Sequence, residues 1–233
     1  MTVAELSRTA EVSDMTIRRD LEALERTGAL RRVHGGAISA VSRSYEPPFA
    51  LRAGRETEAK QRIGRLAASL LSEGDTAIVD VGSTTLELAR ALRDAERLTI
   101  LTPSLRVADE LADNAEIRLI VTGGTARPGE LSLIGDLAER TFDDLHADVV
   151  FLGVGGVDTV GLTEFNLDDT RVKRAALRSA RRCVALADAT KLGRVAFARV
   201  CPLERVDMLV TDSSADSAAL QPIREAGVEV LVA

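Results

Sequence analysis

The feature that most constrains the fold is a series of short, almost uninterrupted apolar runs, which alternate with amphipathic segments from residue 58 onward. A strand that is apolar on both faces must be covered on both faces, as in a parallel sheet flanked by helices. Strands are predicted at 76–81, 98–102, 117–122, 148–154, 182–187, 206–211 and 228–232. Helices are predicted at 58–71, 84–93, 104–113, 168–181 and 215–226. Residues 58–233 are therefore predicted to form a Rossmann-like α/β domain.

The first forty residues follow a different pattern, with two short helices. Thr2 and Glu5 have the spacing of a capping box, so a helix is predicted to begin near Val3. A second helix follows Ser13, and Gly28 is predicted to end it. Its inward face is predicted from three apolar residues spaced at i, i+4 and i+7, which are Ile17, Leu21 and Leu24.

A hairpin is predicted to follow these helices, as two short strands within residues 30–38 that turn at Gly35-Gly36. Two helices joined by a short turn and followed by a hairpin are typical of a winged helix-turn-helix, which is predicted here for residues 1–40. Residues 41–57 contain Pro47-Pro48 and show no clear periodicity, so they are predicted to be a linker with extended backbone.

Local charge favours DNA as the partner of the first segment. The whole chain has a formal net charge of −6, yet residues 26–45 contain no acidic residue. In a helix-turn-helix the second helix enters the major groove, where Arg side chains pair with guanine or phosphate. The residues predicted to contact DNA are Ser13, Met15, Thr16, Arg18, Arg19, Arg31, Arg32 and His34. The alternative is a solvated helix in which Arg18 pairs with Glu22.

Polar residues follow several of the predicted strands. Gly82 opens a helix whose first residues carry hydroxyls, and amides at a helix N-terminus favour an anion. This predicts a phosphate cradle, with an ordinary capped helix start as the alternative. Ligands of parallel α/β sheets bind at the carboxyl ends of the strands, so one polar site is expected there. The candidate effector-binding residues are Asp80, Gly82, Ser83, Thr84, Thr85, Thr102, Ser104, Gly124, Asp158, Lys173, Asp188 and Lys191.

Motifs along essentially the whole chain resemble those of the DeoR/GlpR family of bacterial regulators. They are Ser13-x-x-Thr16-Ile17-Arg18-Arg19, Arg31-Arg32-Val33-His34-Gly35-Gly36, Tyr45-Glu46-x-Pro48-Phe49 with Arg52, Gly135-x-Leu137-Ala138-Glu139, Val172-Lys173-Arg174-Ala175 and Asp188-x-x-Lys191-x-Gly193. The resemblance implies a homo-oligomeric repressor with a ribose-5-phosphate-isomerase-like sensor domain. It also implies that a phosphorylated sugar or polyol releases the protein from operator DNA.

The chain departs from this family pattern at several positions. Family members have a further helix before the position of Met1, so the helix-turn-helix is expected to be truncated. The apolar stripe of Val3, Leu6, Ile17 and Leu21 is then expected to be partly uncovered. In the sensor domain the departures are Val81-Gly82-Ser83 for Ser-Gly-Thr, Pro103 for Asn, and Asp169-Thr170 for Glu-Ala. These substitutions bear on which sugar is bound.

The sequence does not favour a metal site, a cofactor or a catalytic centre. Cys183 and Cys201 lie in apolar surroundings, and His34 and His146 have no neighbour at ligand spacing. The chain shows no signal peptide and no apolar run of membrane-spanning length, which predicts a cytoplasmic protein.

Two alternatives to a regulator stay open. One is a sugar-phosphate isomerase, with Asp158 or Asp188 as the base and Lys173 as the electrophilic partner. The other is a sugar-phosphate-binding module that does not bind DNA.

Overall fold

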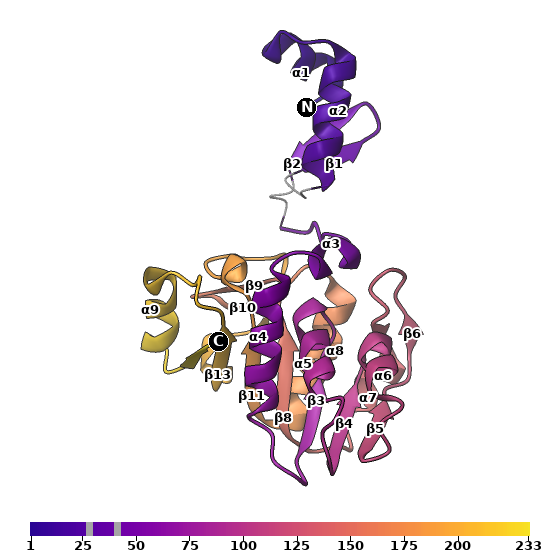
Figure 1. Ribbon diagram of the computed structural model, residues 1–233, viewed down its shortest axis with the longest axis vertical. Coiled ribbons are helices and arrows are strands. Elements are labelled where there is room, and N and C mark those ends of the chain that lie inside the picture. The colour runs from indigo at the N-terminus through magenta and orange to yellow at the C-terminus, as the bar shows by residue number, and fades with distance from the viewer. Residues whose placement is uncertain (27–29, 40–42) are drawn as a thin grey trace.

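The computed structural model describes residues 1–26, 30–39 and 43–233. An N-terminal module of two helices and a hairpin is joined, through the short helix α3, to a larger α/β domain (Figure 1). No helix in the described ranges has both the length and the apolar character needed to span a lipid bilayer.

The N-terminal module has the order predicted from the sequence. Its elements are α1 (Val3–Ala10), α2 (Asp14–Arg26), β1 (Leu30–Val33) and β2 (Gly36–Ser39). The capping box is present, because the Glu5 amide donates to Thr2 Oγ1 and the Thr2 amide donates to the Glu5 carboxylate. Gly28 and the predicted end of the second helix lie outside the described residues.

The hairpin turns one residue earlier than predicted, at His34-Gly35. Gly35 has a φ of +84°, the left-handed region that glycine adopts without strain. Gly36 instead pairs with Val33 in the antiparallel ladder. A Cβ on Gly36 would lie 2.2 Å from the Met1 carbonyl oxygen, so a residue without a side chain lets the N-terminus pack against the hairpin.

The expectation of an uncovered apolar stripe is wrong for three of its four residues. Val3, Ile17 and Leu21 are buried in one cluster with Ala37, and Leu6 is partly buried against it. The hairpin covers this cluster and is held to the N-terminus, because the Ala37 amide donates to the Met1 carbonyl and the Met1 ammonium donates to the Ala37 carbonyl.

Leu24 does not face inward as predicted. Its side chain is 44% exposed, because the buried cluster of the N-terminal module ends one turn earlier on α2, at Leu21.

A seven-stranded sheet forms the centre of the larger domain, in the order β14-β13-β11-β8-β3-β4-β5. The strands are β3 (Thr76–Val79), β4 (Leu98–Thr102), β5 (Ile117–Val121), β8 (Ala147–Gly153), β11 (Ala180–Leu186), β13 (Met208–Thr211) and β14 (Glu229–Val232). Every neighbouring pair in this sheet is parallel. The predicted α/β class and the seven predicted strands are therefore confirmed.

Helices cover both faces of the sheet, which explains why its strands are apolar throughout (Figure 1). The helices are α4 (Thr57–Ala68), α5 (Ser83–Ala91), α6 (Leu105–Leu111), α7 (Asp136–Arg140), α8 (Leu167–Ser179) and α9 (Ser217–Glu225). Ile78 and Val79 are adjacent in β3 and both fully buried, but they belong to opposite clusters because side chains alternate along a strand. Val79 packs in the cluster of α4, α5 and α6, and Ile78 packs in that of α7, α8 and α9.

Shorter elements surround the strand ends, and the sequence patterns did not predict them. They are β6 (Thr125–Ala126), β7 (Leu133–Ile134), β9 (Gly156–Asp158), β10 (Gly161–Glu164), β12 (Ala198–Cys201) and two 3-10 turns, Ala189–Lys191 and Leu203–Arg205.

The segment predicted to be a plain extended linker contains a helix, α3 (Phe49–Ala53). Pro48 sits at its N-cap, where the fixed φ of proline suits a helix start. The guanidinium of Arg106 lies 3.9 Å from the centroid of the Phe49 ring, and that of Arg52 lies 5.6 Å from it. These contacts attach the segment to the α/β domain.

Candidate functional site

Four of the eight residues predicted to contact DNA lie on α2, and a fifth, Ser13, directly precedes it. Arg18 and Arg19 are exposed, and Met15 is 76% exposed. The Thr16 amide donates to Ser13 Oγ, so Ser13 caps α2 as the sequence indicates. The two hydroxyls, Ser13 Oγ and Thr16 Oγ1, lie 2.9 Å apart and bond each other.

A hollow of about 300 Å3 joins α2 to the hairpin. It brings Arg18 from the helix next to Arg32 and His34 from the hairpin. Arg32 donates to the Glu22 carboxylate at 2.7 Å, whereas Arg18 forms no ion pair with any residue that the structure describes. Among the described residues Glu22 thus pairs with Arg32 and not with Arg18. The side chain of Arg31 lies outside the described residues.

Two adjoining cavities lie in the α/β domain where the predicted effector site was expected. The inner cavity, of about 30 Å3, is lined by Glu46, Arg52, Val81, Gly82, Ser83, Thr84, Glu130, Gly153, Val154, Glu164, Phe165, Asp169 and Lys191. The outer pocket, of about 380 Å3, is lined by Pro47, Arg52, Arg55, Glu56, Lys60, Asp188, Thr190, Lys191 and Arg194. Arg52 and Lys191 line both, so the two cavities form one site.

The start of α5 forms one wall of the inner cavity. Gly82 occupies the N-cap with a φ of +138°, and no side chain caps the helix. The amides of the first turn are therefore available to an anion. Ser83 and Thr84 line the cavity, whereas Thr85 is fully buried and its hydroxyl donates to the Gly82 carbonyl. Two of the three predicted hydroxyls thus remain for a ligand.

Lys173 lies behind this wall, in a buried cluster of charges. Its ammonium donates to the Asp80 carboxylate and, at 2.9 Å, to the Gly153 carbonyl, and lies 3.3 Å from the Glu164 carboxylate. Burial alone would lower the pKa of Lys173, but Asp80 and Glu164 outweigh burial and raise it. Burial raises the pKa of both carboxyls, and Lys173 opposes that rise. Lys173 and Asp80 thus hold each other and the end of β8 at Gly153 in place.

Two arginines close the inner cavity by binding carboxylates from distant parts of the chain. Arg52 donates to Glu130 and, at 3.2 Å, to Glu46. Arg127 donates to both carboxylate oxygens of Glu46, at 2.8 and 3.2 Å, and to Asp169. All five side chains are at most 18% exposed. Residues 46–53, named here the strap, are thereby fastened over the cavity.

The outer pocket carries more positive than negative charge. Its cations are Arg52, Arg55, Lys60, Lys191 and Arg194, and its acids are Glu56 and Asp188. The pKa of Lys191 is lowered to about 8, mainly by burial and also by Arg194 and Arg52, while Asp188 opposes the shift. Burial also lowers the pKa of Lys60. Arg55 Nη2 is buried without a hydrogen-bond partner in the ranges that the structure describes. Such a pocket suits an anion.

Seven of the twelve predicted effector residues line neither cavity. Three of them, Asp80, Thr85 and Lys173, lie behind the wall as described above, and the other four are Thr102, Ser104, Gly124 and Asp158. The Thr102 hydroxyl donates to the Val79 carbonyl, and Ser104 caps α6 by accepting from the Val107 amide. A Cβ on Gly124 would lie 2.5 Å from the Ile134 carbonyl oxygen, so Gly124 packs directly against the backbone of β7. Asp158 accepts hydrogen bonds from Thr159. The contacts of these four residues are made within the domain scaffold.

Several residues of the site escaped the sequence interpretation. Glu46 and Arg52 appeared only through the family resemblance, and Asp169 only as a departure from it. Glu130, Glu164, Arg127, Arg55, Lys60 and Arg194 were not singled out. They share no local motif, and only the fold brings them together. The sequence signal for part of this set is a cluster of lysine and arginine after residue 51, which indicates an anion site.

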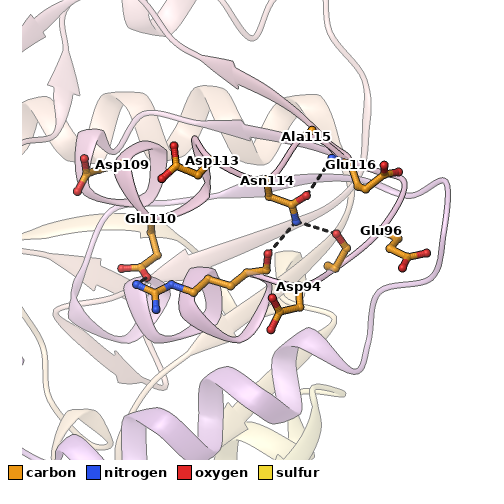
Figure 2. Close-up of a pocket in the computed structure, with 10 residues that line it drawn as sticks. Asp94, Glu96, Asp109, Glu110, Asp113, Asn114, Ala115 and Glu116 are labelled. Atoms are coloured by element: carbon orange, nitrogen blue, oxygen red, sulfur yellow. Dashed lines mark hydrogen bonds and ion pairs between the residues drawn. The ribbon is translucent and has the colours of Figure 1, made fainter.

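A larger cavity, of about 570 Å3, lies between the end of α5 and α6. Figure 2 shows carboxylates around it, including Asp94, Asp109, Asp113 and Glu116. Asn114 also lines this cavity, and its side-chain amide donates to the Arg93 and Ala95 carbonyls at 2.8 Å each. Its negative charge repels anions, so this cavity is not a candidate for a phosphorylated ligand.

Comparison with known proteins identifies both parts of the chain. Residues 1–43 match the model of the DeoR-like helix-turn-helix domain, and residues 55–213 match that of the DeoR C terminal sensor domain. The chain is 38% identical to the HTH-type transcriptional regulator GolR of Listeria innocua, over 100% of this chain and 92% of that protein. It is 34% identical to the HTH-type transcriptional repressor GlcR of Bacillus subtilis, over 100% of this chain and 90% of that protein.

Among solved structures, the chain is similar to ribose 5-phosphate isomerase A of Methanocaldococcus jannaschii. The TM-score is 0.42 and the sequence identity 20%, over 58% of this chain and 54% of that chain.

Proposed function

The chain belongs to the DeoR family of transcriptional regulators, and we propose that it represses an operon for sugar or polyol catabolism until a phosphorylated sugar or polyol binds its sensor domain. It is a DNA-binding regulator and not an enzyme, in contrast to the isomerase alternative. Because it binds DNA, we infer that it acts in the cytoplasm. The observation that carries the effector proposal is a pocket with five cations and two acids beside a cavity lined by carboxylates.

The two cavities suit the two ends of a phosphorylated polyol. The phosphate is proposed to bind where Lys191 meets the uncapped amides of α5, since both border the inner cavity and Lys191 also faces the outer pocket. The hydroxyls are proposed to bind among the carboxylates of Glu46, Glu130, Glu164 and Asp169, which accept hydrogen bonds.

The strap is proposed to couple the effector to DNA. The inner cavity of about 30 Å3 holds about one water molecule, so a sugar enters only when Arg52 and Glu46 move. These residues follow the DNA-binding module along the chain, so movement of the strap changes the position of α2. In the proposed homo-oligomer, two such modules bind two half-sites, and a change in their spacing releases the operator.

The test is fluorescence anisotropy of the purified protein with the duplex upstream of its own operon, at one fixed moderate salt concentration. The measurement is repeated with a panel of sugar and polyol phosphates. Tight binding that one phosphate relieves supports the proposal and identifies the effector. Failure to bind the duplex, or binding that no phosphate changes, contradicts the DNA or the effector part respectively.

Arg18→Ala is expected to weaken operator binding by about 5- to 150-fold, the range for the loss of a specific Arg contact. Arg18 is exposed and forms no ion pair with the described residues, so its loss leaves the thermal unfolding midpoint unchanged. Arg8→Ala is the matched control, because Arg8 is an exposed cation of the same module on α1. Equal losses in both variants would indicate only a general charge effect.

Effector binding is expected to weaken as the pH rises from 7 to 9. The pKa of Lys191 is lowered to about 8, so its ammonium is lost above that pH in the free protein. A bound phosphate raises this pKa again, so binding above pH 8 takes up a proton. The affinity should fall by up to about tenfold per pH unit above 8.

Calorimetric titration in two buffers of different ionisation enthalpy measures the proton uptake. Lys191→Arg should abolish this uptake. An affinity that is constant from pH 7 to 9 contradicts the prediction.

A further inference from the structure

We infer that Asp169 is the residue that selects the hydroxyl pattern of the effector, by accepting a hydrogen bond from one hydroxyl of the polyol chain. This inference rests on the proposed function, because it assigns a role within the same site. Asp169 contacts the end of the ligand that lies away from the phosphate. The chemical class recognised there is a neutral polyhydroxyl chain.

One carboxylate oxygen of Asp169 has no hydrogen-bond partner in the part of the chain that the structure describes. Its side chain is 4% exposed and lines the inner cavity. Oδ2 accepts a hydrogen bond from the Arg127 guanidinium. Oδ1 is buried and has no hydrogen-bond partner within residues 1–26, 30–39 and 43–233. A buried acceptor of this kind is normally paired, so its partner is expected to be a group that enters the cavity.

The carboxylate of Asp169 is held in one position before any ligand binds. Asn166 caps α8, because its Oδ1 accepts from the amides of Asp168 and Asp169 at 2.8 and 3.1 Å. Arg127 fixes the other end of the side chain. An acceptor fixed in this way favours a donor at one position of the ligand over a donor at another.

The other carboxylates of the cavity are already engaged. Both oxygens of Glu46 accept from arginines, and Glu130 accepts from Arg52. Glu164 accepts from the Phe165 amide through Oε1, and its Oε2 lies 3.3 Å from the Lys173 ammonium. Among the described residues, Asp169 Oδ1 is thus the fully buried carboxylate oxygen of this cavity that has no donor.

The charge of the network identifies the kind of group that Asp169 binds. The buried acids are Glu46, Asp80, Glu130, Glu164 and Asp169, and the cations that pair with them are Arg52, Arg127 and Lys173. With five acids and three cations in this network, and with the remaining cation of the cavity, Lys191, assigned to the phosphate, a second anionic group in the inner cavity would be repelled. Hydroxyls supply donors without adding negative charge, so a neutral polyol chain fits and a second acidic group does not.

The test compares sugar phosphates with inorganic phosphate on the full-length protein. Dissociation constants are measured by calorimetry for inorganic phosphate, glycerol 3-phosphate, ribose 5-phosphate, glucose 6-phosphate and sorbitol 6-phosphate. The added affinity is the ratio of the dissociation constant of inorganic phosphate to that of the organic phosphate that binds most tightly. It measures what contacts in the inner cavity contribute to binding. In Asp169→Asn, the amide oxygen turns toward Arg127 and a donor replaces the free acceptor. This variant is expected to lose about 10- to 100-fold of the added affinity and to bind inorganic phosphate unchanged.

Asp168→Asn is the matched control, since Asp168 is the preceding carboxylate of α8 but is exposed and lines neither cavity. An unchanged thermal midpoint shows that each variant folds. Added affinity that survives Asp169→Asn overturns the inference and leaves the proposed function standing. Loss of inorganic phosphate binding in that variant also overturns it, because Asp169 then acts on the whole site. If no organic phosphate binds more tightly than inorganic phosphate, the proposed effector class fails, and this inference fails with it.

Discussion

Replacing Lys173 with methionine is expected to lower the free energy of unfolding by about 3–5 kcal/mol, the cost of removing one partner from a buried ion pair. Lys173 is 1% exposed, and its ammonium contacts the carboxylates of Asp80 and Glu164. Methionine has a similar length but no charge, so the variant leaves two buried carboxylates facing each other without a cation. Urea unfolding followed by circular dichroism at pH 7 measures the change in free energy.

The pH dependence of this loss distinguishes charge from packing. Burial raises the pKa of Asp80 and of Glu164, and without Lys173 both values rise further. The two carboxyls then become neutral as the pH falls, so the stability difference between wild type and variant is largest near pH 7 and shrinks toward pH 5. A difference that does not depend on pH would assign the loss to packing alone.

Two further variants serve as controls for Lys173. Asp80→Asn combined with Lys173→Met removes a buried negative charge and should recover part of the lost stability. Arg171→Met changes a cation of the same helix that is 58% exposed and pairs with Glu139 at the surface. Its effect should stay below about 1 kcal/mol, as for other surface ion pairs. An equal loss for Arg171→Met and Lys173→Met would contradict the prediction.

The sheet could be predicted from the sequence because its signal is local. Each strand is a short apolar run, and burial on both faces of a parallel sheet requires such runs, as at Ile78 and Val79. The helix start at Gly82 could be predicted for the same reason, since a glycine and a run of hydroxyls at a strand–helix junction lie next to one another in the chain.

The carboxylate lining of the inner cavity could not be predicted in this way. Arg52 and Glu130 are 78 residues apart, Arg127 and Glu46 are 81 apart, and Arg127 and Asp169 are 42 apart. Each of these residues, considered alone, is an ordinary charged residue of a loop or helix end. Only the order of the strands brings them to one place, and no periodicity encodes that order.

The incorrect expectations have related causes. The stripe of Val3, Ile17 and Leu21 is covered by the hairpin, whose approach depends on Gly36 having no side chain where Met1 packs. The linker contains α3 because Phe49 stacks on Arg106, a residue of a distant helix. In both cases a tertiary contact decides the structure of a segment whose own sequence is compatible with more than one conformation.

Lys191→Met is expected to give a repressor that the effector cannot release. Lys191 lines both cavities, and it is the cation placed between the cradle and the outer pocket. Loss of one partner from a desolvated ion pair costs about 2–4 kcal/mol, so effector affinity should fall by roughly 30- to 1000-fold. The operator affinity of the free protein should not change, because Lys191 belongs to the sensor domain. Anisotropy titrations of the protein–operator complex with the effector measure both quantities.

Lys191→Met is not expected to lower the free energy of unfolding, in contrast to Lys173→Met. The pKa of Lys191 is lowered to about 8 by burial and by Arg194 and Arg52, which means that its charge is unfavourable in the free protein. An uncharged side chain of similar length therefore relieves repulsion between cations in the outer pocket, whereas the same change at Lys173 leaves the Asp80 carboxylate without its cation.

Arg178→Met is the control, because Arg178 is an exposed cation on α8, and this variant should leave release from the operator unchanged. If Lys191→Met leaves the operator at the same effector concentration as wild type, the phosphate binds elsewhere and the outer pocket is not the sensor.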